Sequence, residues 1–360
     1  MRTFTPSLLL VLAACSGGLA TTDAAAPSPT RPIGQGGSGG TDGGAGTIPE
    51  RGPDGGPADP PSDPTPDPTP SSPDAGPPPP PPPPPLAPIF PADNPWNTRI
   101  DGAPVDSRSD AYIAQMGADL PLIAAWDAEG DGIPFVEVNR SQAMVGVSYW
   151  GFPDESDPGP FPIPWNAQPD PSGDRHVIVV DRQRGFLYEL FQGSRNPDGS
   201  WSASNGARWN LWSNAVRPLG WTSADAAGLP IFPGLVRWDE VDSGWIGHAL
   251  RFVVGQSQQG FVWPARHAAG VCPLGSDCPP MGLRVRLKQS VDISGFSWRM
   301  QVILQALKDY GMFVADNGGG TSWWLSGAPD PRFSDADTRS LSQITGKDFE
   351  VVQHGAITPE

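Results

Sequence analysis

The stretch HVIVVDRQRGFLYELF (residues 176–191) contains two short runs of β-branched and aromatic residues separated by a polar segment. Such runs, bounded by Gly, Asp or Asn, are typical of β-strands, and a short polar connection between them is typical of a hairpin. The pattern therefore predicts a β-hairpin that turns at Arg184 and Gly185. It favours a mainly β domain around it.

Segments outside this hairpin extend the same pattern. Short apolar runs that end at Gly, Pro, Asn or Asp occur at 132–138, 143–151, 206–212, 246–254, 260–266, 282–287, 311–316 and 321–326. Helical periodicity appears in SWRMQVILQALKDYG (297–311) and in SDADTRSLSQI (334–344), each with a serine at its cap position. We therefore expect a β-sandwich or barrel-like domain with two or three peripheral helices.

The first residues have the pattern of an export signal. A charged residue, Arg2, precedes a short apolar run that is too short to span a bilayer, which predicts a signal peptide at 1–14. The segment Leu12-Ala13-Ala14-Cys15 resembles the lipobox of bacterial lipoproteins, which implies lipidation of Cys15 and export by Sec. Ser16 in place of Asp implies release to the outer membrane. An ordinary secretory signal with a chance cysteine is the alternative.

Residues 15–86 have the composition of a tether. They are rich in Gly, Pro, Ser, Thr and Asp and include the unbroken proline run 77–85. Such a composition cannot bury enough apolar surface to offset chain entropy, so we expect a disordered tether with a stiff polyproline rod. The remaining residues, 87–360, show no second linker and no repeat. They predict a single globular domain.

Charge and cysteine content restrict the partners. The formal net charge of −16 disfavours nucleic acid and anionic lipid, so we expect contact with a membrane only through the lipid on Cys15, and a monomer. With Cys15 modified, Cys272 and Cys278 remain, and their short Pro- and Gly-containing loop predicts a disulfide in an oxidising compartment. A metal site would need more ligands than this loop offers.

Several segments resemble a group of uncharacterised secreted bacterial proteins. They include PADNPWN (91–97), DRHVIVVDR (174–182), GLVRWDEV (234–241), GHALRF (247–252) and LKDYGMFVADNG (307–318). The resemblance spans nearly all of 88–352 and supports one intact domain. It implies no activity, so it assigns no functional residue.

Familiar catalytic motifs do not occur in the chain. It contains no nucleophile elbow, no His-Glu-x-x-His and no Walker loop, which disfavours common serine hydrolases and nucleotide enzymes. We expect no cofactor. Asp127, Glu129 and Asp131 provide half of a calcium loop, but Val138 stands where the bidentate acid is required. A plain acidic turn is the alternative interpretation there.

The stretch GLVRWDEVDSGWIGHALRF (234–252) concentrates ionisable residues. Asp239 is expected to cap a helical turn that ends at Gly244, with Glu240 at the rim of a cleft. Strand alternation is expected to place His248 on one face of the following strand and Arg251 on the other. The hypothesis is that Glu240, His248 and Arg251 lie in one cleft.

Two classes of function fit these features. A tethered, acidic, tryptophan-rich β domain suits a polysaccharide or glycan as partner, either as an enzyme or as a binding module. A glycoside hydrolase needs two carboxylates across a cleft, for which Glu240 with Asp181 or Asp316 are candidates. A polysaccharide lyase needs a base, such as His248 or Tyr188, and a cation such as Arg251.

Further candidates follow from the same reasoning. His176, which shares its predicted strand face with apolar residues, is a possible catalytic histidine, although a structural role is equally compatible with that pattern. A non-catalytic carbohydrate-binding or structural cell-envelope module would need only aromatic platforms, and we expect these at Trp263, Trp323 and Trp324. Because adjacent strand residues alternate, one of Trp323 and Trp324 is expected to face outwards.

Overall fold

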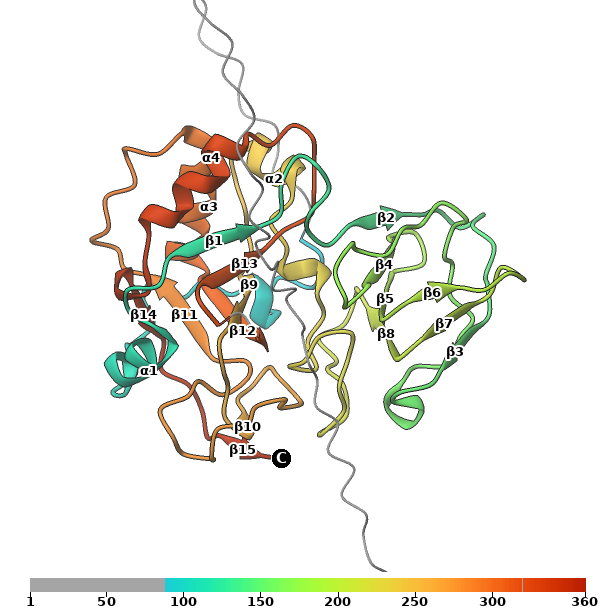
Figure 1. Ribbon diagram of the computed structural model, residues 1–360, viewed down its shortest axis with the longest axis horizontal. Helices are drawn as coiled ribbons and strands as arrows, with labels where there is room; N and C mark the ends of the chain where they lie inside the picture. Colours follow the sequence, from blue (N-terminus) through green and yellow to red (C-terminus); the bar gives the residue numbers. More distant parts are fainter. Residues whose placement is uncertain (1–87, 319) are drawn as a thin grey trace, which may run out of the picture. The chain divides into compact units, whose positions relative to one another are not determined.

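The computed structural model describes residues 88–318 and 320–360 (Figure 1). The predicted signal peptide, the lipidation site at Cys15 and all of the predicted tether lie outside these residues. Within them, no helix is long and apolar enough to cross a membrane.

A mixed six-stranded sheet forms the larger part of the fold, in the order β1-β13-β9-β12-β11-β14. The neighbours β1 and β13 are parallel, as are β9 and β12, and the other three pairs are antiparallel. Its strands are β1 (Leu122–Ala125), β9 (Leu250–Val254), β11 (Arg284–Leu287), β12 (Met312–Asn317), β13 (Trp323–Ser326) and β14 (Phe349–Val351). The central strand β9 is thus built by long-range pairing with strands from far along the chain.

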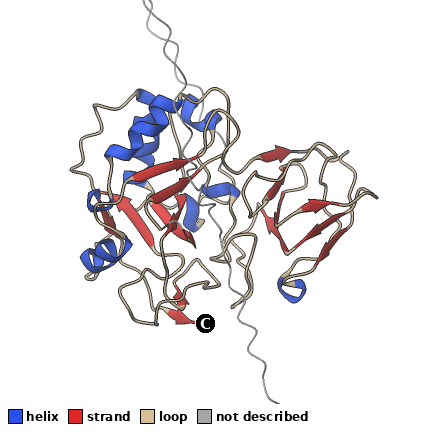
Figure 2. Ribbon diagram, in the orientation of Figure 1, coloured by secondary structure: helices blue, strands red, loops and turns tan. Residues whose placement is uncertain are grey.

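In the described ranges, four α-helices pack around this sheet. Figure 2 shows the helices in blue. They are α1 (Ser109–Met116), α2 (Trp238–Ser243), α3 (Trp298–Asp309) and α4 (Asp335–Ser340). The two helices predicted at 297–311 and 334–344 are confirmed, and their N-caps are Ser297 and Ser334 as expected. Only the Ser334 side chain accepts the capping hydrogen bond. Helix α1 was missed, because its apolar residues do not form a strong helical stripe.

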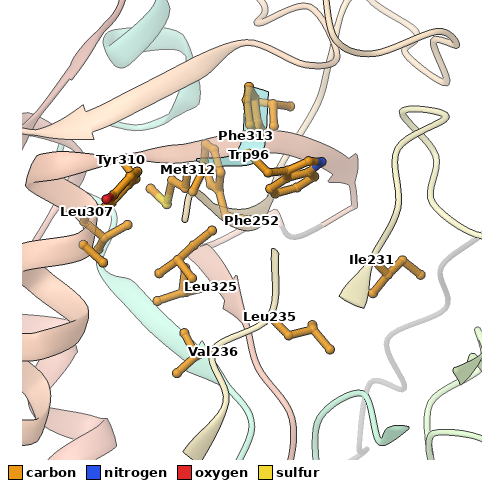
Figure 3. Packing of buried hydrophobic residues seen from close by; sticks show 14 of the residues in the cluster. Trp96, Ile231, Leu235, Val236, Phe252, Leu307, Tyr310, Met312, Phe313 and Leu325 are labelled. Atoms are coloured by element: carbon orange, nitrogen blue, oxygen red, sulfur yellow. The ribbon is translucent and has the colours of Figure 1, made fainter. Parts of the chain in front are cut away.

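The core under the sheet is formed by large apolar side chains (Figure 3). Phe252, Leu325 and Met312 come from adjacent strands and are fully buried, and Trp96 meets Phe313 edge-on at 4.9 Å. Burial of such side chains stabilises each by about 1.5–3 kcal/mol, and this sheet therefore supplies a rigid support for residues on its strands.

Trp323 belongs to this core. It is 1% exposed and stacks between Phe252 at 5.2 Å and Phe349 at 5.1 Å. Trp323 therefore presents no free face to a ligand, and its predicted role as a binding platform is wrong. Trp324 points the other way, which confirms that one member of the pair faces outwards.

Two smaller sheets form a second lobe. One has the order β2-β4-β5-β8 and the other the order β3-β7-β6. The predicted hairpin is confirmed, since Asp181 on β4 pairs with Phe186 on β5 and Gly185 has a φ of 73° in the turn. The strands are β2 (Phe135–Glu137), β3 (Val147–Tyr149), β4 (Val177–Asp181), β5 (Phe186–Phe191), β6 (Ser194–Arg195), β7 (Trp201–Ala203) and β8 (Asn205–Asn210).

The two lobes are joined by a buried carboxylate. Glu189 on β5 accepts hydrogen bonds from the backbone N–H groups of Ile231 and Phe232, both at 2.9 Å, and from Trp209 Nε1 at 3.0 Å. Burial raises the pKa of Glu189 to about 7 even though these donors act to lower it. These bonds hold the short helix Phe232–Gly234 against the second lobe.

The protein is mainly β with several sheets, as predicted, and its sheets give a sandwich-like rather than a barrel fold. No sheet in the described part of the chain closes into a barrel. A two-stranded ribbon pairs β10 (Gly260–Phe261) with β15 (Thr358–Pro359). The predicted disulfide between Cys272 and Cys278 is confirmed.

Candidate active site

A cavity of about 790 Å³ opens beside the six-stranded sheet, and we call it the main cavity. Its wall combines the β9, β12 and β13 strands with the segment that leads into β4 and with α4. On β9, the core-facing residues Leu250 and Phe252 alternate with Arg251 and Val253, which line the cavity. Strand alternation in the long-range sheet thus delivers Arg251 to this site.

Asp316 reaches the main cavity from an irregularity in β12. The register against β9 shifts between Val314 and Asp316, which is a β-bulge, and bulges often re-aim a side chain at a functional site. The N–H of Asn317 donates to Asp316 Oδ1 at 2.7 Å. Burial, and next the negative charge of Asp225, raises the pKa of Asp316 to about 7. Asp316 can therefore carry a proton near neutral pH.

Arg251 is held by a buried ion pair. Its Nη2 donates to Asp225 Oδ1 at 2.7 Å and its Nη1 to Ser326 Oγ at 2.8 Å. Burial works to lower the pKa of Arg251, but the carboxylates of Asp225 and Asp316 outweigh it and the pKa is raised. Burial raises the pKa of Asp225 to about 6, against the opposing effect of Arg251. Asp225 is therefore the buried counter-charge of Arg251.

His176 lines the main cavity just before β4. Its backbone N–H donates to Asp170 Oδ2 at 2.5 Å, which fixes the chain as it enters the strand. His176 is 5% exposed, and burial lowers its pKa, which favours the neutral ring. Asp174 lines the same cavity, and its negative charge acts to raise the pKa of His176 and that of Asp316.

Five buried polar atoms around this site have no hydrogen-bond partner among the described residues. They are His176 Nδ1, Arg251 Nε, Asp225 Oδ2, Trp126 Nε1 and Asp335 Oδ1. Leaving such a group unsatisfied costs about 1–3 kcal/mol, and clusters of them mark places where the fold is not optimised for stability alone. All of these residues except Asp225 line the cavity itself.

Aromatic and apolar surface forms another part of the cavity wall. Trp324 on β13 is half-buried and lines it, together with the buried Trp126 and with Ile133. Flat aromatic faces beside carboxylates are suited to a sugar ring, which has apolar faces and a polar rim. Of the three predicted aromatic platforms, Trp324 is therefore the one at the cavity.

The charge of the wall is predominantly negative. Its basic residues are Arg251 and Arg339, whereas its acidic residues are Asp127, Asp131, Asp170, Asp174, Asp316 and Asp335. Arg251 is already paired with Asp225, so the balance inside is more negative than these residues alone suggest.

The acidic turn at 127–131 is a local structural device. Asp127 Oδ1 accepts backbone N–H bonds from Glu129, Gly130 and Asp131 at 2.8–3.0 Å. An oxygen that three N–H donors already occupy is a poor cation ligand, which favours the plain turn over half of a calcium loop. No group of three or more His, Cys, Asp or Glu residues suited to a metal occurs in the described ranges.

Glu240 and His248 lie in a second, smaller cavity of about 170 Å³, which Trp245 and Tyr310 also line. Glu240 accepts from Arg237 Nη2 at 2.5 Å and lies 3.1 Å from His248 Nε2. Burial acts to raise the pKa of Glu240, but Arg237 and His248 outweigh it, so the pKa is lowered. All three side chains are buried and bonded to one another, which is typical of a structural network.

The single cleft predicted for Glu240, His248 and Arg251 is therefore divided between two places. Strand β9 begins only at Leu250, so His248 lies in the preceding turn. The capping prediction is also wrong: Arg237 occupies the N-cap of α2, while Asp239 is exposed inside the helix. The helix does end at Gly244, as predicted, with the left-handed φ of 85° that glycine tolerates best.

The other predicted site residues lie away from the main cavity. Asp181 is fully buried and accepts from Arg184 Nη1 at 2.6 Å and from the Arg184 N–H at 2.8 Å, which stabilises the hairpin turn. Tyr188 is buried in the second lobe against Phe161. Trp263 is 58% exposed and lines no cavity described above.

Sequence reasoning missed Asp225 and Asp174 and named Asp316 only as an alternative to Asp181. The one signal for Asp225 was the need of Arg251 for a buried counter-charge. Comparison with protein-family models, curated proteins and solved structures finds no match to the chain. The site must therefore be interpreted from its own chemistry.

Proposed function

We propose that this protein is a glycoside hydrolase that acts on a neutral polysaccharide from a lipid-anchored position at the bacterial outer membrane. The observation that carries the proposal is the carboxyl of Asp316, raised in pKa to about 7, in a cavity with an aromatic wall. A carboxylic acid that keeps its proton near neutral pH is what protonation of a glycosidic oxygen requires.

The proposed chemistry uses two carboxyl groups. Asp316, as the acid, donates its proton to the glycosidic oxygen while the bond to the anomeric carbon breaks. Asp174, the neighbouring carboxylate, either attacks that carbon or takes a proton from the water that does so. The charges of Arg251 and Asp225 act on the pKa of Asp316, and Trp324 stacks against the sugar ring.

The charge of the cavity favours hydrolysis over the lyase alternative. A polysaccharide lyase neutralises the carboxylate of a uronic acid with a cation. The guanidinium of Arg251 instead donates hydrogen bonds to Asp225 and Ser326, and acidic residues outnumber basic residues in the cavity wall. A polyuronate would be repelled, so the expected substrate is uncharged.

The anchored location rests on the lipobox-like segment that ends at Cys15 and on the proline-rich composition of 16–86. A tether of this kind would let the domain reach an insoluble polymer beyond the membrane. Replacing Cys15 by Ser should move the protein from the membrane fraction to the soluble fraction; retention at the membrane would contradict lipid anchoring.

The activity is tested by incubating the full chain with xylan, mixed-linkage β-glucan, galactomannan and polygalacturonate, and measuring new reducing ends. We expect release from at least one neutral polymer and none from polygalacturonate. Asp316→Asn and Asp174→Asn should each abolish release, whereas Glu240→Gln should retain it in the folded fraction.

Turnover that survives Asp316→Asn, or that requires Glu240 instead, would refute the assignment. Formation of unsaturated products that absorb in the ultraviolet would favour the lyase. Binding without turnover of any polymer would favour the alternative function, a non-catalytic carbohydrate-binding module.

A further inference from the structure

A second concave surface lies on the second lobe, and we call it the edge groove. It has a volume of about 510 Å³ and shares no lining residue with the main cavity. One wall is β2 with the loop after it, and the other is the turn at 164–167. Strand β2 pairs only with β4, so this wall is the outer edge of its sheet.

The turn presents an exposed tryptophan on a fixed support. The N–H of Ala167 donates to Pro164 O at 3.1 Å, so Trp165 and Asn166 occupy the tip of a β-turn. Pro164 and Ala167 are buried on either side, while Trp165 is 77% exposed. Arg195 Nη1 donates to Trp165 O at 2.7 Å and holds the tip. Trp165 stands in the chain between Pro164 and Asn166, which both line the groove.

The opposite wall is also rigid. Asn139 Oδ1 accepts from the N–H of Ser141 at 2.9 Å and from its hydroxyl at 2.5 Å. The side chain of Gln183 accepts from the N–H of Arg140 at 3.1 Å, and the Arg140 guanidinium donates to Gln183 O at 2.9 Å. The loop is therefore tied to the β4–β5 hairpin before any ligand arrives, which lowers the entropy cost of binding.

The groove offers amide groups with hydrogen-bonding capacity to spare. The side chain of Asn166 has no hydrogen-bond partner among the described residues, and Asn139 uses its oxygen but not its amide N–H donors. Within the described part of the chain, the side-chain amide of Gln142 makes only a long hydrogen bond, to Ala143 O at 3.3 Å. Amides carry both donors and acceptors, which is what vicinal sugar hydroxyls need.

The groove carries no unpaired charge. The one ionisable residue in its lining is Glu137, whose Oε1 lies 3.0 Å from Arg182 Nε. Amide groups, a neutralised carboxylate and an exposed indole at the adjacent turn do not suit an anionic or a cationic ligand. They suit an uncharged sugar chain, whose rings stack on tryptophan and whose hydroxyls meet amides.

From this arrangement we infer a second, non-catalytic glycan-binding site in the edge groove, in which Trp165 stacks on a sugar ring and Asn139, Gln142 and Asn166 bind its hydroxyls. Such a site goes beyond the proposed hydrolase activity. It would hold a neutral polymer on the second lobe independently of the main cavity.

The test is affinity gel electrophoresis of the full chain carrying Asp316→Asn, which removes turnover, in gels that contain xylan, mixed-linkage β-glucan or galactomannan. We expect at least one polymer to retard the protein. Adding Trp165→Ala should raise the dissociation constant at least about tenfold, and Trp165→Phe should retain part of the binding. Trp212→Ala is the matched control, because Trp212 is 68% exposed on the same lobe but lies against Gly185.

The melting temperatures of these variants should agree with that of the parent, since Trp165 is exposed. Equal retardation with and without Trp165, or the same loss with Trp212→Ala, would overturn the site. Absence of retardation by every polymer would overturn it as well. Hydrolysis of soluble oligosaccharides by the wild-type chain is scored separately, so the proposed activity can stand or fall independently of this site.

Discussion

Removal of the Asp316 carboxyl should stabilise the protein at high pH while it destroys the activity. Burial raises the pKa of Asp316 from 3.8 to about 7. Each pKa unit corresponds to about 1.4 kcal/mol, so keeping this group ionised in the folded state costs up to about 4 kcal/mol. Asp316 is half-buried and still reaches the cavity, which makes this figure an upper limit.

The sign of the pH dependence follows from proton binding. Between the unfolded pKa of 3.8 and the folded pKa of about 7, the folded protein holds a proton that the unfolded chain releases. The contribution of Asp316 to the free energy of unfolding is therefore most favourable below this window and falls as pH rises through it. An asparagine does not titrate, so Asp316→Asn lacks this loss.

The assay is urea denaturation of the wild type and Asp316→Asn at about pH 4, near the lower edge of this window, and at about pH 8.5, above its upper edge. The unfolding free energy of the variant minus that of the wild type should be larger at the higher pH than at the lower pH, by up to about 4 kcal/mol. Asp131→Asn is the control, because Asp131 lines the same cavity but is exposed.

Equal destabilisation by Asp316→Asn at both pH values would refute the reasoning. It would mean that Asp316 is an ordinary structural carboxylate that its neighbours keep ionised. A stabilised variant that keeps full turnover would instead separate the pKa shift from the proposed acid role.

Three further predictions concern other buried contacts. Asp225→Asn should lower the unfolding free energy by about 3–5 kcal/mol in urea denaturation, because it leaves Arg251 as an uncompensated buried charge; a neutral effect would contradict the ion pair. Glu240→Gln should lower the unfolding free energy by a similar amount, because the ion pair with Arg237 is lost, and should leave turnover per folded molecule unchanged. A selective loss of turnover would restore Glu240 as a catalytic candidate. Replacement of both Cys272 and its partner Cys278 by Ser should lower the unfolding free energy by at most about 2 kcal/mol, because the closed loop is short. In the wild-type protein, alkylation without reductant followed by mass spectrometry should find no free thiol at either position.

The sequence by itself determined the features that depend on near neighbours. The hairpin at 176–191, the helix after Ser297 and the short disulfide loop all follow from residue types within a few positions of one another. The end of helix α2 at Gly244 is likewise determined by a near neighbour in the sequence. Each of these features has a local physical cause: side-chain alternation, apolar periodicity, a left-handed glycine or a small ring.

Short strands with weak local patterns were not predictable in this way. Leu122–Ala125 and Phe349–Val351 contain only three or four residues each, and they are strands because they pair with Trp323–Ser326 and Arg284–Leu287. Their strand state is a consequence of long-range hydrogen bonding. Their local sequences do not require it.

Only the tertiary structure decided which ionisable residues share a site. Parallel pairing of β9 with β12 places Arg251 and Asp316 on the wall of one cavity, and the loop that contains Asp225 then supplies the counter-charge of Arg251. The same folding separates Arg251 from His248, although only two residues lie between them in the sequence. The pKa of a carboxyl depends on the water excluded from it and on charges that reach it across the fold. Neither quantity exists until distant strands have paired.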